Sequence, residues 1–299
     1  MPNIRFVLAT LVRARSGMPA ALGFDQAVAL PVVWVTAHHC FVQSQLRSLQ
    51  DALVHAASGG VGLASVEMVM KARATIHGTA GGLAKHVLLR SCNVVRLSSS
   101  RDAAACAALL SRLLRGRRLH SLVNSLSNDF ISLSLGLLAS QGVLLEIGKN
   151  SIWSHDRALA AQPLLDYVAV AVDDGCRHCP GWNVDVWWFN GKLRALTARA
   201  CAGDVQPLLF EGVAFHEHAV RAALRLLQRG ANLGKLVVLV GLREPVVDKR
   251  QAPSIPEAHS LHTLDRGADL GTLVHLSIES VNCVAVLELH DPELSLIHI

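Results

Sequence analysis

The stretch that decides the fold is Ala52-Leu-Val-His-Ala-Ala-Ser-Gly-Gly-Val-Gly62. An apolar run comes first, a glycine-rich turn follows, and residues 63–71 continue with a helical pattern. Set against the pattern Gly-x-Gly-x-x-Gly, the three special positions are Ala57, Gly59 and Gly62, so alanine fills the first. Strand, glycine turn and helix in this order begin a βαβ unit that binds a dinucleotide. An ordinary strand-turn-helix built from small residues is the alternative.

The segments around this stretch alternate between strand-like and helical patterns. Strands are expected at residues 52–57, 74–79, 94–97, 119–124, 143–148 and 167–172, with helices at 63–71, 103–115 and 130–138. Residues 25–50 predict one or two helices joined at Pro31, residues 185–201 and 218–228 predict C-terminal helices, and residues 235–240 predict a buried strand. This alternation predicts an α/β fold, a Rossmann-type doubly wound parallel sheet covered by helices on both faces.

Composition divides the 299 residues into four parts. Residues 1–23 are a leader of unclear role, and residues 24–241 hold the predicted sheet and C-terminal helices. Residues 242–271 have the character of a linker, since three prolines and mixed charge gather between residues 243 and 258. Residues 272–299 are β-like at first, and we expect them to be the truncated start of a following domain and a poorly structured tail.

Charge and hydropathy exclude two classes of partner. The net charge is +5, but the 28 basic residues are spread along the chain and aromatic residues make up only 4%, so we expect no nucleic acid. Mean hydropathy is +0.36. The longest uncharged runs, such as residues 131–145, are broken by Gly, Ser and Gln and are shorter than the roughly 20 apolar residues of a membrane span. We therefore expect no membrane span.

Cysteine and histidine patterns predict no metal centre. Seven cysteines in a chain of this length indicate a reducing compartment rather than a disulfide scaffold. Cys176-Arg-His-Cys179 is a single Cys-x-x-Cys pair, which lacks the second pair of a zinc site. His38-His39 and His216-x-His218 have no carboxylate or cysteine company, so we interpret these histidines as structural.

The leader bears on localisation. Residues 1–17 carry Arg5, Arg13 and Arg15 and no acid, a weak likeness to an organelle transit segment that an arbitrary leader explains equally well. We expect a cytoplasmic protein, or one in an organelle (plastid) stroma, and not a secreted one.

The end of the second expected strand indicates which nucleotide is bound. An NAD-binding unit has an Asp or Glu there for the ribose 2′-hydroxyl. This strand ends in Thr79-Ala80-Gly81-Gly82 without an acid, and Lys85 follows. A missing acid and a nearby base favour a 2′-phosphate, and therefore NADPH. In the alternative interpretation, Lys85 is a solvated helix residue.

Five motifs in order resemble one known family. They are His55-Ala-Ala-Ser-Gly-Gly-Val-Gly62, Ser99-Ser-Arg-Asp102, Val123-Asn-Ser-Leu-Ser-Asn-Asp-Phe130, Leu145-Glu-Ile-Gly-Lys149 and Leu233-Gly-Lys-Leu-Val-Val-Leu239. Together they are similar to the enoyl reductase domain of polyketide synthases and animal fatty acid synthase, a member of the medium-chain dehydrogenase/reductase superfamily. The resemblance extends from about Phe24 to Val240.

The resemblance implies an activity and a set of site residues. The family uses NADPH to reduce an enoyl thioester on an acyl carrier protein, with hydride going to the β-carbon and a proton to the α-carbon. Neighbouring polyketide synthase domains are the implied partners. Lys149 and Asp173 match the proposed proton donors, with Asp174 as the alternative to the aspartate and a surface ion pair as the other interpretation. The implied cofactor-binding residues are Thr36, Ala57, Ser58, Gly59, Gly60, Val61, Gly62, Thr79, Lys85, Asn124, Glu146, Ile147, Gly148 and Lys235.

Several features depart from the family pattern. Residues 1–23 are too few for the GroES-like substrate-binding domain that precedes the cofactor domain in family members. His86 stands where arginine is frequent, and Asn232 where histidine is common. Residues 281–293 resemble the first strand of a crotonase-type domain, and the last six residues resemble a translated sequencing adapter, so we exclude them from the fold prediction.

The sequence leaves two other functions open and disfavours a third. One is a free-standing medium-chain reductase that acts on quinones or enones, and another is a non-catalytic nucleotide-binding remnant. A short-chain reductase needs Tyr-x-x-x-Lys, whereas the one tyrosine, Tyr167, is followed by Ala171 at the lysine position. The favoured function is NADPH-dependent enoyl reduction within a polyketide synthase-like megaenzyme.

Overall fold

The main sheet of the protein is parallel throughout. The computed structural model describes residues 22–149, 151–170, 172, 186–239 and 284–286. Six strands lie in the order β3-β2-β1-β4-β5-β6. Their bounds are Asp51–Val54 (β1), Thr75–Ala80 (β2), Arg96–Ser99 (β3), Leu119–Asn124 (β4), Leu138–Glu146 (β5) and Asp166–Ala169 (β6). The strand order reverses beside β1, which confirms the predicted Rossmann-type doubly wound sheet.

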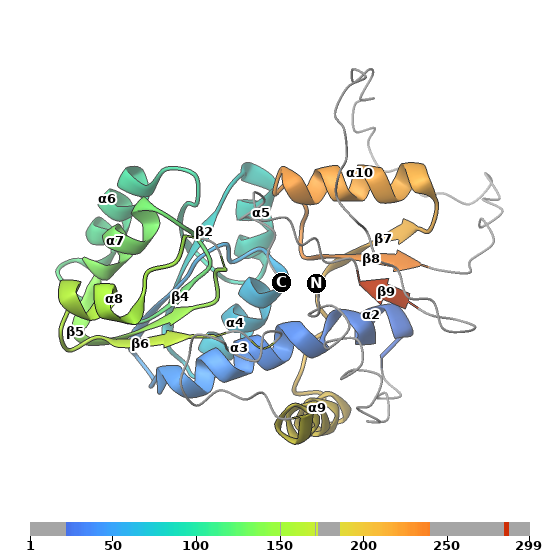
Figure 1. Ribbon diagram of the computed structural model, residues 1–299, viewed down its shortest axis with the longest axis horizontal. Coiled ribbons are helices and arrows are strands. Elements are labelled where there is room, and N and C mark those ends of the chain that lie inside the picture. Colours follow the sequence, from blue (N-terminus) through green and yellow to red (C-terminus); the bar gives the residue numbers. More distant parts are fainter. Residues whose placement is uncertain (1–21, 150, 171, 173–185, 240–283, 287–299) are drawn as a thin grey trace, which may run out of the picture.

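Helices cover both faces of this sheet (Figure 1). One face carries α3 (Pro31–Ser44), α4 (Gly60–Lys71) and α5 (Leu83–Ser91), and the other carries α6 (Ala103–Leu114), α7 (Asp129–Leu135) and α8 (His155–Ala161). Strand β1 shows why both faces are needed, since Ala52 and Val54 pack on the α4 side and Leu53 packs on the α6 side. Its alternate side chains point to opposite faces, and all of them are buried.

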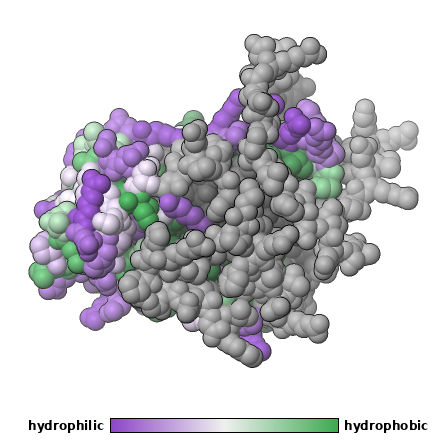
Figure 2. Space-filling view, in the orientation of Figure 1, coloured by the Kyte–Doolittle hydropathy of each residue, from purple (hydrophilic) through white to green (hydrophobic). Residues whose placement is uncertain are grey.

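A second, smaller sheet lies beside the first and is covered by α10 (Glu217–Gln228) (Figure 1). Strands β7 (Phe210–Ala214) and β8 (Lys235–Leu239) are parallel, and β9 (Val284–Val286) pairs antiparallel with β8. Val213 and Val238 pack against Ala223 and Leu227 of α10. In Figure 2 the outer side of α10 is hydrophilic, with apolar atoms beneath it, as expected for an amphipathic helix. The remaining helices are α2 (Phe24–Ala29) and α9 (Val186–Cys201).

Several predicted boundaries were wrong. The first strand was expected to reach Ala57 but ends at Val54, because the backbone turns at Ala56, whose φ is 45°. The expected helix at residues 130–138 ends at Leu135, because Gly136 caps it and β5 begins at Leu138. No bounds were predicted for α5, α8 or β7. Most residues of the predicted linker and tail lie outside the described residues, and Val284–Val286 of that tail form β9.

Candidate nucleotide-binding site

The glycine-rich turn joins β1 to α4 and shapes an anion-binding helix end. Gly59 donates its N–H to the Ala56 carbonyl at 2.9 Å, and α4 begins at Gly60 with no side-chain cap. The first N–H groups of a helix have no partner within it, so they can bind a phosphate. A Cβ on Gly62 would lie 2.6 Å from the Ala56 oxygen, so only glycine lets α4 approach the turn this closely. Backbone and glycine positions both suit a dinucleotide pyrophosphate.

Two further residues of the site pack around this turn. Lys235, at the start of β8, is only 8% exposed, and a Cβ on Gly60 would lie 2.7 Å from its Cδ. Gly234 donates its N–H to the Ser58 carbonyl at 3.0 Å, which ties the β8 end to the turn. Thr36 is buried in α3, where its hydroxyl donates to the Val32 carbonyl of the same helix at 2.8 Å.

A buried histidine is linked to the glycine-rich turn through the Thr79 hydroxyl. His55 follows β1, and its ring contacts the Thr79 hydroxyl at 3.1 Å and the Ser134 hydroxyl at 2.8 Å. The Thr79 hydroxyl in turn accepts the Ala56 N–H at 3.0 Å. Burial lowers the pKa of His55 to about 3, so its ring is neutral and has one donor and one acceptor nitrogen for these two contacts. His55 was quoted in a motif but was not among the predicted site residues.

Two cations meet at the end of β2, where no carboxylate stands. Lys85 of α5 donates to the Gly230 carbonyl at 2.7 Å, and Arg101, just after β3, donates to the Arg229 carbonyl at 3.2 Å. Burial and the nearby Arg101 charge lower the pKa of Lys85. A Cβ on Gly81 would lie 2.8 Å from Arg101 Nε, so glycine leaves room for the guanidinium.

Sequence reasoning selected Lys85 and missed Arg101. The signal for Arg101 was present, because it follows the third strand, the parallel neighbour of the second. The carboxyl ends of adjacent parallel strands meet at one edge of a sheet, so a cation after each strand can reach the same ligand group.

The ends of β4 and β5 bring Asn124 and Glu146 together. The Asn124 amide donates to Glu146 Oε2 at 2.6 Å, and Glu146 Oε1 accepts the Gly148 N–H at 2.7 Å. Burial raises the pKa of Glu146 to about 7, while its two amide donors act in the opposite direction. Ile147 donates its N–H to the Asn124 carbonyl at 2.9 Å.

Of the two predicted catalytic residues, Lys149 lies within the described residues and Asp173 does not. Lys149 follows this loop and its side chain is exposed. Asp173, the alternative Asp174 and the pair Cys176 and Cys179 lie outside the described residues. The pairing of Lys149 with an aspartate therefore stays a prediction.

The described residues show neither a metal-binding cluster nor a helix suited to a membrane. Within these ranges, no three or more His, Cys, Asp or Glu side chains gather as a metal ion would require. No helix there combines the length and the apolar character needed to cross a bilayer.

Comparison with known proteins places the chain among biosynthetic reductases. No protein-family model matches it. A highly reducing polyketide synthase of Aspergillus terreus, curS1, is 30% identical over 246 residues, which are 81% of this chain and 10% of that protein. The chain thus spans about a tenth of the length of the curated relatives it matches.

Solved structures agree with this relationship. The crystal structure of the CurK enoyl reductase is 27% identical with a TM-score of 0.65, and the match covers 75% of this chain and 64% of that one. The nucleotide-binding subdomain of the enoylreductase domain of PpsC from Mycobacterium tuberculosis is 26% identical with a TM-score of 0.51, over 60% of this chain and 97% of that one. The chain therefore belongs to the enoyl reductase domains of polyketide synthases, in the medium-chain dehydrogenase/reductase superfamily.

Proposed function

We propose that this chain is the NADPH-binding part of a polyketide synthase enoyl reductase that reduces an enoyl thioester on an acyl carrier protein. The observation that carries the cofactor choice is the pair Lys85 and Arg101 at the acid-free end of β2. Both now donate to consecutive backbone carbonyls, and the oxygens of a 2′-phosphate are stronger, charged acceptors for the same groups. An NAD ribose would instead need a carboxylate at this place.

The remaining site residues would hold the other parts of the nucleotide. The N–H groups at the start of α4, from Gly60 to Gly62, would bind the pyrophosphate. His55 and Thr79 would hold the turn that carries those groups. Ile147 and Gly148, at the end of β5, would border the nicotinamide half.

The proposed chemistry needs one proton from the protein. NADPH, when bound, would supply the hydride that becomes the new hydrogen on the β-carbon of the enoyl thioester. The Lys149 ammonium gives a proton to the α-carbon, so the carbon–carbon double bond becomes a single bond. An aspartate beside it, Asp173 in our assignment, would keep Lys149 charged until the transfer. The exposed position of Lys149 leaves it accessible to a substrate.

Nucleotide titration tests the cofactor assignment. The purified full chain should bind NADPH at least about 10-fold more tightly than NADH, because two charge-assisted hydrogen bonds depend on the 2′-phosphate. Lys85→Ala and Arg101→Ala should each weaken NADPH binding by about 10-fold and leave NADH binding nearly unchanged. Arg90→Ala, an exposed cation on the same helix as Lys85, is the matched control. Equal affinity for the two nucleotides in the unmodified chain would refute the NADPH assignment.

Adding a crotonyl thioester to the NADPH complex tests the reaction. Oxidation of NADPH that slows in Lys149→Ala, with NADPH affinity nearly unchanged, supports enoyl reduction. NADPH binding without oxidation would indicate a nucleotide-binding remnant. Turnover of a quinone but not of the thioester would indicate a free-standing quinone reductase.

A further inference from the structure

Asn124 and Glu146 use their polar atoms on each other and on the protein backbone. They are register partners at the carboxyl ends of β4 and β5, and they are 0% and 1% exposed. Asn124 Oδ1 accepts the Leu126 N–H at 3.2 Å, and Asn124 Nδ2 donates both to the Leu126 carbonyl at 2.7 Å and to Glu146 at 2.6 Å. The amide group has two N–H donors, and both are engaged in this way.

The Glu146 carboxylate is committed in the same manner. One oxygen accepts from Asn124, and the other accepts from the Gly148 N–H at 2.7 Å. A Cβ on Gly148 would lie 2.7 Å from Glu146 Oε1, so the carboxylate sits directly against the backbone of this residue. A cofactor group that accepts a hydrogen bond would therefore have to displace one that Asn124 already donates.

Both side chains form hydrogen bonds with the loops that follow β4 and β5, at the same end of the sheet as the glycine-rich turn. Asn124 fixes the peptide groups of Leu126, and its own carbonyl accepts the N–H of Ile147. Glu146 fixes Gly148, the residue before Lys149. Its main-chain carbonyl also accepts the Val170 N–H at 2.7 Å, which ties the same point to β6. The two loops are thus set by one pair of side chains.

We propose that Asn124 and Glu146 are a positioning pair, which fixes the backbone of residues 125–126 and 147–149 and through it the direction of Lys149. The inference rests on the proposed function for the role of Lys149, but not for the pair itself. An apolar pair would fill the same space without the cost of burying a carboxyl group. The carboxylate supplies what an apolar side chain lacks, an acceptor for the Gly148 N–H.

A donor–acceptor swap tests this pair in the full chain. In Glu146→Gln, one side-chain N–H must face either the Asn124 amide or the Gly148 N–H, so one hydrogen bond is lost. Adding Asn124→Asp turns residue 124 into an acceptor, which restores the bond between the two side chains and the net charge of wild type but gives up the bond from Asn124 Nδ2 to the Leu126 carbonyl. Residues in contact should be non-additive, so the double variant should recover the hydrogen bond of the Gly148 N–H, although not the contact with the Leu126 carbonyl. Glu67→Gln, which removes a half-buried acid on α4, is the control.

Two readouts separate the pair from the proposed function. Hydrogen exchange of the Gly148 amide should be about 10-fold faster in Glu146→Gln and return toward wild type in the double variant. The turnover number with crotonyl thioester should follow the same order, with an NADPH dissociation constant changed by less than about threefold. Unchanged exchange in Glu146→Gln, or additive effects in the double variant, would overturn the positioning pair. Normal turnover together with fast exchange would overturn the link to Lys149, and an inactive wild type with the expected exchange pattern would refute the proposed function while supporting the pair.

Discussion

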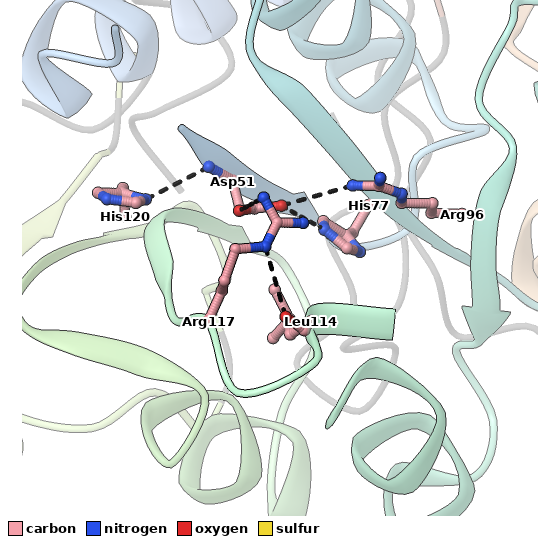
Figure 3. A network of polar contacts seen from close by, with 6 residues as sticks. All are labelled: Asp51, His77, Arg96, Leu114, Arg117 and His120. Carbon is pink, nitrogen blue, oxygen red and sulfur yellow. Dashed lines mark hydrogen bonds and ion pairs between the residues drawn. The ribbon is translucent and has the colours of Figure 1, made fainter. Parts of the chain in front are cut away.

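Two buried carboxylates lie at opposite ends of the strands of the main sheet, and the groups that contact them differ in charge. Asp51 is the first residue of β1, and Glu146 is the last residue of β5. Each is only 1% exposed. Figure 3 shows Asp51 surrounded by His77, Arg96 and Arg117. The His77 ring, whose pKa is lowered by burial, forms a hydrogen bond of 3.0 Å with Asp51, and the Arg96 and Arg117 guanidinium groups form ion pairs at 3.5 and 2.9 Å. Glu146 has hydrogen bonds from two neutral amides.

The difference separates the end of the sheet around Asp51 from the end that holds the proposed nucleotide site. Two arginine charges and the hydrogen bond with His77 compensate the loss of hydration of Asp51, so this carboxylate joins three strands and the turn before β4. Neutral donors compensate Glu146 less fully, and burial raises its pKa to about 7. Strongly perturbed groups cluster at functional sites because the geometry is kept at a cost in stability. The edge with Glu146 is also the edge that carries the glycine turn.

The largest effect is expected from Asp51→Asn. This change removes the charge that Arg96, Arg117 and His77 surround, and breaking a buried pair costs about 3–5 kcal/mol of unfolding free energy. We expect the lower end of that range, because both arginines are partly exposed and can reach water. Urea denaturation would measure it, and NADPH titration of the folded variant should give the wild-type affinity. A large loss of affinity in folded protein would show that the two edges are not independent.

The second prediction concerns the pH dependence that Glu146 imposes. Because its pKa in the folded protein is raised from 4.5 to about 7, the native state binds more protons than the unfolded state between these values, and stability falls as pH rises through them. This residue alone should lower the unfolding free energy by roughly 3 kcal/mol between pH 4.5 and pH 7 or above. Glu146→Gln should lack this decrease.

The measurement compares urea denaturation of wild type and Glu146→Gln across that pH range. Buried histidines such as His55, whose pKa is lowered to about 3, act in the opposite direction, since their stability contribution is lost as pH falls below the unfolded value. They are present in both proteins and cancel in the difference. If the difference in stability between wild type and Glu146→Gln did not change with pH, the pKa of Glu146 would not be raised, and Glu146 would not differ from Asp51 in the way proposed.

The parts of the fold that the sequence predicts are those with strong periodicity. The alternation and the glycine turn predict a doubly wound parallel sheet, and the structure gives its strand order. No bounds are predicted for α5, because Leu83 and Val87 are exposed and only Leu89 is buried, so the helix lacks a continuous apolar face. Strand β7 is hard to recognise for the same reason, since Val213 is its one buried residue.

The sequence predicts the site residues that belong to one continuous motif. It does not predict contacts between residues that only the pairing of neighbouring strands brings together. The glycine turn and Lys85 can be read directly from the chain. Arg101 needs the adjacency of β2 and β3, and the pairing of Asn124 with Glu146 needs the register of β4 and β5. Family resemblance assigned these last two residues to the cofactor, and that assignment stays a prediction. Within the protein, the two side chains contact each other and the backbone.

A smaller effect is expected from a pair of histidine variants, one at each edge. His55→Phe keeps an aromatic side chain but removes two hydrogen bonds beside the glycine-rich turn. We expect about 1–2 kcal/mol of lost stability and NADPH binding weakened by about 3–10-fold. His77→Phe, at the Asp51 edge, should cost a similar amount of stability and leave NADPH affinity unchanged. Calorimetric titration with NADPH checks both. If His55→Phe and His77→Phe lost NADPH affinity equally, His55 would have only a structural role.

The smallest effect is expected from Arg96→Ala, and its size tests why the Asp51 edge is stable. Arg96 Nη1 lies 3.5 Å from Asp51 Oδ1 in an ion pair without a hydrogen bond, and its side chain is 34% exposed. Partly exposed pairs contribute about 0–1 kcal/mol, and Arg117 stays at 2.9 Å from the other oxygen. We therefore expect a change in unfolding free energy below about 1 kcal/mol, decreasing further in high salt. A loss near that of Asp51→Asn would mean that Asp51 depends on all of its cations together, so that the edge is a cooperative network rather than one strong contact with weaker neighbours.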